Sequence, residues 1–203
     1  MRVTPQAEDS ARLQKLFGDL YAQRMPRPEM QSAVFDVILE RLRCARVSMW
    51  KFEGSGDELA LICFASKNAA GDFRFANEGR LQPDEFIHYF NGLVDSGIYM
   101  SADALNDPAL QAMREHYLIP HNVCSMLDAA FVLNNRTYGM VCCEEPYRRE
   151  WQLADVMALR AIVNKIALLM WNSPDGKLAG SPSLPLRAIL SEPEPPPPDP
   201  RRR

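Results

Sequence analysis

Two apolar runs near the middle of the chain predict a β-hairpin. The runs span 123–133 and 136–144, and an Asn-Asn pair at 134–135 separates them. Asn tolerates the left-handed backbone that a two-residue hairpin turn requires. With this pair as the loop, Leu127 is expected to lie opposite Cys142. Both faces of the hairpin are mostly apolar, which predicts that both are covered by other parts of the chain.

Asp128 interrupts the apolar pattern of the first run. A carboxylate inside a covered sheet needs a hydrogen-bonding or charged partner, and Arg46 or backbone N–H groups are the candidates that would make its role structural. The alternative is that Asp128 orients a ligand. The expected register places Leu127, Ala129, Phe131 and Leu133 on one face with Cys142, Met140 and Tyr138, and Met126, Ala130 and Val132 on the other face with Cys143 and Val141.

Helical spacing of apolar residues and strand-like runs predict the remaining elements. Ser10 is the expected cap of the first helix, Pro83 occupies a first helical turn, and Gly97 ends that helix. The expected helices are 10–23, 29–42, 83–96 and 151–171, with a shorter one opened by Asp107 and Pro108; the expected strands are 45–52, 58–66 and 98–101, with a loose strand within 68–80.

The last predicted helix carries apolar residues in near-heptad spacing. This pattern has two interpretations: the residues cover the sheet, or they form half of a helical seam in a homodimer. For a homodimer, apolar positions of the first helix would join the seam. The candidate interface residues are Leu16, Leu20, Val156, Val163, Ile166 and Met170.

The composition divides the chain into three parts. Residues 1–27 form an N-terminal helix and linker, residues 28–171 form the folded domain, and residues 172–203 form a proline-rich tail. Such a tail cannot build a core, so we expect it to be extended and disordered. It serves either as a plain tail or as a docking peptide, since Pro197, Pro200 and Arg202 fit a proline-ligand spacing.

Charge and hydropathy exclude several classes of protein. The formal net charge is −3 and the pI is about 5.7, which gives no basic surface for nucleic acid. No apolar run approaches the roughly 18 residues that cross a membrane. Residues 1–10 lack the apolar core of a signal peptide. These observations predict a soluble cytoplasmic protein.

Five cysteines, an odd number without framework spacing, argue against a disulfide scaffold. The simplest interpretation is small, buried, reduced thiols. A redox pair of Cys124 and Cys143 across the hairpin is the alternative. No zinc-type cluster of Cys and His is present in the sequence, so no metal is expected.

Four segments in the same order resemble the GAF domain family. They are Arg46–Phe52, Ile98–Pro108, the hairpin segments Ser125–Ala130 and Tyr138–Cys142, and Arg149–Trp151 at the start of the last helix. The family often has Pro at the position of Ala130. The resemblance covers roughly residues 28–171. It implies an α/β (α+β) fold with an antiparallel sheet of five or six strands. The first, second and last helices would lie on one face, and the middle helices would form a pocket on the other.

The resemblance also implies a sensor or regulatory module in signal transduction. Such a module binds a small-molecule effector, dimerises, or does both, and acts on a signalling partner in trans. Its pocket would lie between the sheet and the middle helices, with His121 in the connector above it. The candidate ligand-binding residues are Phe86, Phe90, Tyr117, His121, Cys124, Met126, Asp128 and Cys143.

Other branches of the family are less well matched. A thiol-based free methionine sulfoxide reductase would carry a Gly-Cys-Gly type turn, and the corresponding stretch here is 119–122 without it. The Cys-His dipeptide of bilin attachment and the signature of cyclic-nucleotide binding are also missing. The sequence therefore favours a module without enzymatic activity and implies no particular cofactor. A ligand-free dimerisation scaffold is the main alternative.

Overall fold

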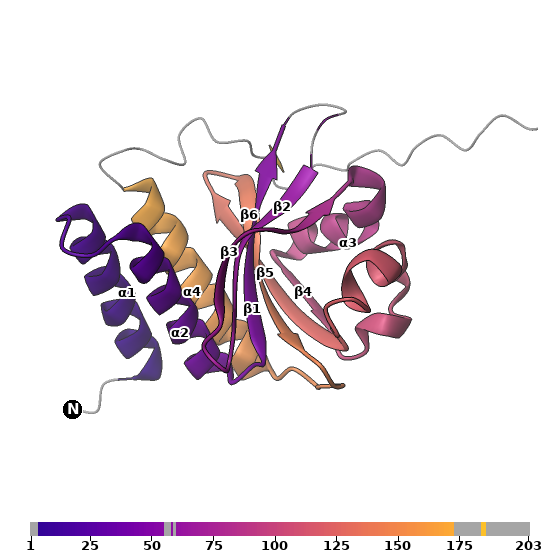
Figure 1. The fold of residues 1–203 in the computed structure, drawn as a ribbon, viewed down its shortest axis with the longest axis horizontal. Coiled ribbons are helices and arrows are strands. Elements are labelled where there is room, and N and C mark those ends of the chain that lie inside the picture. The colour runs from indigo at the N-terminus through magenta and orange to yellow at the C-terminus, as the bar shows by residue number, and fades with distance from the viewer. Residues whose placement is uncertain (1–3, 55–57, 59, 173–183, 186–203) are drawn as a thin grey trace, which may run out of the picture.

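The computed structural model describes residues 4–54, 58, 60–172 and 184–185, with the backbone alone for 75–78, 83–86 and 184–185. The chain begins with two helices, continues through strands and shorter helical segments, and returns to a long helix, α4, after the last long strand (Figure 1). The elements are α1 (Pro5–Tyr21), α2 (Arg27–Leu42), β1 (Arg46–Glu53), β2 (Ala60–Asn68), β3 (Phe73–Leu81), α3 (Pro83–Ser96), β4 (Ile98–Ser101), the short turns η2 (Ala104–Asn106), η3 (Pro108–Met113) and η4 (Arg114–Leu118), β5 (Ser125–Leu133), β6 (Arg136–Glu145), α4 (Leu153–Trp171) and β7 (Leu184–Pro185).

One antiparallel sheet forms the centre of the fold. Its strand order is β3-β2-β1-β6-β5-β4, and β7 adds a short pairing to β6. Helices α1, α2 and α4 lie on one side of the sheet, with α1 packed on α2 and α4, and α3 with the short turns lies on the other side (Figure 1). Each face has its own hydrophobic core, because successive residues of a strand point to opposite faces and the central strands are apolar on both. The expected fold class and the expected placement of the helices are confirmed.

The predicted start of α1 was wrong. The helix begins at Pro5, so Ser10 lies inside it, and the Thr4 side chain caps it by accepting a hydrogen bond from the Ala7 N–H. Pro at the first helical position explains the earlier start, since its missing N–H is not needed there. The helix opened by Asp107 and Pro108 is present as short 3₁₀ and π turns, with the Asp107 side chain as its cap.

The hairpin turn is confirmed, but the register beyond it was wrong. Asn134 and Asn135 both have positive φ, and Leu133 pairs with Arg136. A bulge then shifts the pairing between Ala130 and Val132, so that Leu127 lies opposite Cys143 and Asp128 opposite Cys142. A bulge adds one residue to a strand and exchanges its faces. Consequently Met126, Ala130, Met140 and Cys142 face α3, while Leu127, Ala129, Phe131, Val141 and Cys143 face α2 and α4.

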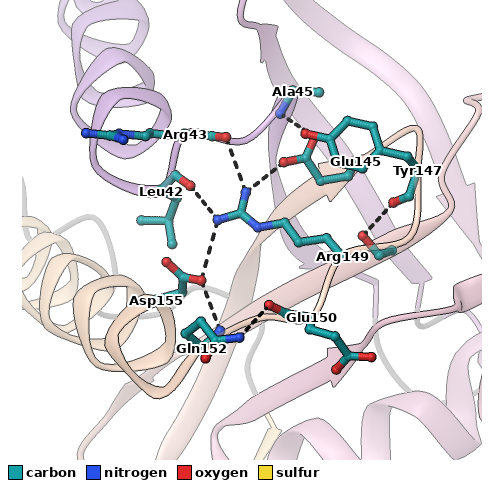
Figure 2. Close-up of polar contacts among 10 residues, drawn as sticks. Leu42, Arg43, Ala45, Glu145, Tyr147, Arg149, Glu150, Gln152 and Asp155 are labelled. Carbon is teal, nitrogen blue, oxygen red and sulfur yellow. Dashed lines mark hydrogen bonds and ion pairs between the residues drawn. The ribbon is translucent and has the colours of Figure 1, made fainter.

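Arg149 joins the end of α2, the end of β6 and the start of α4 (Figure 2). Its Nη2 donates to the Leu42 carbonyl at 2.8 Å, and its Nη1 donates to the Arg43 carbonyl at 3.2 Å. It also bonds to the carboxylates of Glu145 and Asp155, at 2.7 and 3.4 Å. The guanidinium therefore serves the last carbonyl groups of α2 as a C-terminal cap.

Candidate functional site

Carboxylates and tyrosines form three pairs beneath α3 and the short turns. Every pair has a tyrosine hydroxyl as donor and a carboxylate as acceptor. The pairs are Tyr89 with Asp128, Tyr99 with Asp107, and Tyr117 with Glu144, with oxygen–oxygen distances of 2.6, 2.8 and 2.5 Å. Strand alternation puts Asp128, Cys142 and Glu144 on this face of the sheet, and α3, β4 and η4 supply the tyrosines.

Asp128 is fully buried in the middle of this face. Its Oδ2 accepts the Tyr89 hydroxyl, and its Oδ1 receives no hydrogen bond from any described N–H or O–H group. Arg46, which the sequence offered as a partner, pairs with Glu144 instead. Burial raises the pKa of the Asp128 carboxyl well above its ordinary value, and the Tyr89 hydrogen bond opposes this only in part. Asp128 therefore holds its proton more tightly than an exposed aspartate.

We expect Asp128→Asn to stabilise the protein by an amount that grows with pH. The folded-state pKa is raised above 3.8, so the stability that the proton supplies is full below that pH and is lost as pH rises towards the folded-state pKa. Asn still accepts from Tyr89 but does not titrate. The gap in unfolding free energy should widen from near zero at about pH 4 to roughly 1–3 kcal/mol at about pH 8. Urea denaturation at both pH values measures it, and a pH-independent gap would contradict the assignment.

Glu144 lies near the end of β6 but does not face solvent. Glu144 is 2% exposed because β6 continues past it between β1 and β5. The Arg46 Nε lies 3.3 Å from its Oε2, and the Tyr117 hydroxyl bonds to its Oε1. Glu145 is also buried, on the opposite face, where Arg149 binds it. Each of the two adjacent glutamates thus has its own arginine.

The structure brings most of the candidate ligand residues to the α3 face. Phe90, Tyr117, Met126 and Asp128 are buried there, and the His121 ring lies 4.8 Å from the Tyr117 ring. Aromatic side chains fill the space between sheet and helices; Trp50 and Tyr117, for example, pack edge to face at 5.2 Å.

Three other candidates lie elsewhere or outside the description. Cys143 is in the core under α2 and α4, because of the bulge, and is separated from Met126 by the sheet. Cys124 is half-buried just before β5. The side chain of Phe86 lies outside the described residues. The predicted cluster therefore loses Cys143 and gains three residues that sequence reasoning missed, Tyr89, Cys142 and Glu144.

Two of the five thiols lie in surroundings that keep them protonated. All five cysteines are unbridged, and burial raises the pKa of both the Cys142 and the Cys143 thiol well above its ordinary value. Such thiols stay protonated, which disfavours nucleophilic chemistry. Within the described residues, no group of three or more His, Cys, Asp or Glu side chains is arranged to hold a metal ion.

The candidate dimer residues divide between core and surface. Val163 and Ile166 are 1% and 2% exposed in the core, so they cannot form a surface seam as predicted. Their side chains face the sheet because it takes up the inner face of α4. Leu16, Leu20, Val156 and Met170 are partly buried and pack at the edge of this core. A different set of four apolar residues is exposed along α4: Leu153, Met157, Leu168 and Trp171.

None of the helices in the described ranges combines the length and apolar character that a membrane crossing requires. No curated protein sequence matches the chain. Solved structures of GAF-type domains are similar in fold. They include the blue-light-absorbing form of the PixJ GAF domain from Thermosynechococcus elongatus, with 17% identity, a TM-score of 0.57 and coverage of 73% of this chain and 86% of that chain.

Two further solved structures have a similar fold. One is the phycocyanobilin-bound GAF domain of a cyanobacterial phytochrome, with 14% identity, a TM-score of 0.63 and coverage of 89% of this chain and 99% of that one. The other is the chromophore-binding domain of a bacteriophytochrome from R. palustris, with 11% identity, a TM-score of 0.59 and coverage of 88% and 64%. The sequence profile of the GAF domain family matches residues 27–170. Because this match spans most of the chain, the protein belongs to the GAF domain family.

Proposed function

We propose that this protein is a regulatory sensor module that binds a small-molecule effector between its sheet and α3, dimerises, and acts on a signalling partner in trans. The observation that carries the proposal is the buried Asp128 carboxyl in the middle of this face, whose Oδ1 accepts no N–H or O–H hydrogen bond from the described residues while the Tyr89 hydroxyl and the Cys142 thiol bond to the carboxyl. Sites for small molecules are mostly apolar with a few placed polar groups. The proposal assigns no enzymatic activity to the protein.

A ligand with N–H or O–H groups fits this site chemically. Its donors would satisfy Asp128 and replace the hydroxyl of Tyr89, which α3 supplies. Tyr89 also packs against Tyr99 of β4 with ring centroids 4.7 Å apart, so a displaced Tyr89 ring would change the contact between α3 and β4. Binding would thus change how α3 lies on the sheet. One of the similar structures is bound to phycocyanobilin, whereas the sequence here contains no Cys-His dipeptide.

Native mass spectrometry of the freshly purified full chain tests the proposal. The expected result is a dimer with an additional small-molecule mass, which Asp128→Ala should remove while circular dichroism shows an intact fold. An Asp107→Ala variant is the control, because it removes a second tyrosine-paired carboxylate that lies in the loop before η3 and not on the sheet. A retained mass that persists in Asp128→Ala, or a wild-type protein of bare polypeptide mass, would overturn the proposal.

The exposed apolar residues of α4 favour a second candidate function, a dimerisation scaffold without ligand. Leu153, Met157 and Leu168 are 73%, 64% and 50% exposed, and they recur at helical spacing. A stripe of this kind on a helix is typical of a protein–protein interface. A second copy of the chain would cover it by pairing α4 with α4.

We expect Met157→Glu combined with Leu168→Glu to dissociate the dimer without unfolding it. Val163→Glu is the contrast, because it places a charge in the core beneath the same helix and should unfold the protein. Analytical ultracentrifugation gives the mass, and a thermal melt gives the fold. If the double variant stays dimeric with an unchanged melting temperature, α4 is not the interface.

A further inference from the structure

A small cavity lies on the face of the sheet opposite Asp128. Its volume is about 80 Å³, and α1, α2, α4 and the neighbouring strands line it. The wall is mostly apolar. Its residues include Phe17, Val34, Phe64, Met30, Met49 and Met170. Methionine side chains adapt their shape to what they contact. The cavity therefore presents an adjustable apolar wall.

Two polar residues of α2 also line this cavity. Arg27 and Gln31 are one helical turn apart, which places them on the same side of the helix. The Gln31 Oε1 is buried and has no hydrogen-bond partner in the described part of the chain. Arg27 is exposed, at the first position of α2, and has no ion-pair partner among the described residues. A helix start is itself favourable for an anion.

We propose that this cavity binds a small monocarboxylate with an apolar tail. The carboxylate would lie against the Arg27 guanidinium at the opening, since arginine binds carboxylates through two parallel hydrogen bonds. The Gln31 amide, whose oxygen and nitrogen can exchange places, would donate to the same group. An apolar cavity of about 150 Å³ holds one benzene ring, so this cavity accommodates roughly three tail carbons on the same basis. A fatty acid of about four carbons has the matching size.

The cavity lies beside a contact between α1 and α4. The Tyr21 hydroxyl donates to the Leu169 carbonyl at 2.7 Å and joins the end of α1 to α4 beside the cavity. Tyr21 and Met170 are both cavity residues. A bound tail would therefore contact both helices at once. The inference is separate from the proposed function, because the two sites lie on opposite faces of the sheet.

Isothermal titration of the full chain with sodium butyrate tests the proposal, with 1-butanol and butylamine as comparison ligands. Butyrate should bind with a Kd below about 1 mM, a level at which even weak specific ligands are measurable. Arg27→Gln should weaken butyrate about tenfold and leave 1-butanol unchanged, because only the charged hydrogen bonds are lost. Arg114→Gln, on the other side of the sheet, is the control for a change in net charge.

A cavity-filling variant tests the location. Leu20→Trp should abolish binding of both butyrate and 1-butanol, since Leu20 lines the cavity from a partly exposed position and a larger ring can extend into it. Met170→Trp replaces it if Leu20→Trp fails to fold in a thermal melt. Butyrate binding that persists in the filled cavity, butylamine binding as tight as butyrate, or no butyrate binding below millimolar concentration would each overturn the proposal.

Discussion

Replacing Arg149 with methionine is expected to lower the free energy of unfolding by about 3 kcal/mol, the low end for breaking a buried ion pair. The loss has two parts. Glu145 is 1% exposed and would remain as an uncompensated buried charge. The carbonyl groups of Leu42 and Arg43 would also lose their donor at the end of α2. Urea denaturation followed by circular dichroism measures the change.

Two companion variants make this prediction specific. Arg149→Lys keeps the charge but cannot serve four acceptors with a planar fork, so it should recover only part of the loss. Arg12→Met removes a surface ion pair whose side chains are 47% and 62% exposed, and should cost less than about 1 kcal/mol. Equal losses for Arg12→Met and Arg149→Met would mean that the junction in Figure 2 adds no stability beyond an ordinary surface pair.

Gly139→Ala is expected to destabilise the protein by at least about 3 kcal/mol, comparable to severe backbone strain combined with overpacking. Gly139 lies in the bulge of β6 with a φ of 153°, a conformation that side chains disfavour. An added Cβ would lie 2.1 Å from the Trp50 carbonyl oxygen of the neighbouring strand. Because that obstacle is backbone, β1 and β6 would have to separate. The melting temperature and the yield of folded protein report the effect.

The matched control for this prediction is Gly18→Ala. Gly18 lies in α1, and an added Cβ would meet no atom within 4 Å. Alanine should stabilise the helix by up to about 1 kcal/mol, the difference in helix propensity. A Gly139→Ala protein as stable as wild type would show that the bulge and the close approach of β1 do not constrain this position.

The elements of the fold follow from sequence more completely than their register does. Periodicity identified every long helix, and the Asn-Asn pair identified the hairpin turn. The bulge beyond the turn has no comparable signal, since the apolar residues around it suit either face. Gly139 was the available clue, because a glycine within a strand often marks a bulge or a close backbone approach. Because the predicted register ignored this glycine, it placed Cys143 on the wrong face of the sheet.

The carboxylate of the candidate site could likewise be predicted from sequence, but its partner could not. Asp128 stands out because a carboxylate in an apolar strand requires a partner. The identity of that partner depends on α3, whose Tyr89 is 39 residues away in sequence. Only the packing of α3 on the sheet brings the two together. The burial of Glu144 could not be predicted for a related reason, since the length of β6 decides whether a residue near its end is covered.

The adjacent glutamates of β6 also determine how this strand aligns with its neighbours. The segment Val141-Cys142-Cys143 is small and apolar throughout, so burial alone would hardly distinguish the observed pairing from one slipped by a single residue. Such a slip would turn Glu144 towards α2 and α4 and Glu145 towards α3, and would take both carboxylates away from their arginines. The two neighbouring carboxylates can both pair with their arginines in only one alignment of β6. These ion pairs therefore fix a register that the apolar residues alone leave ambiguous.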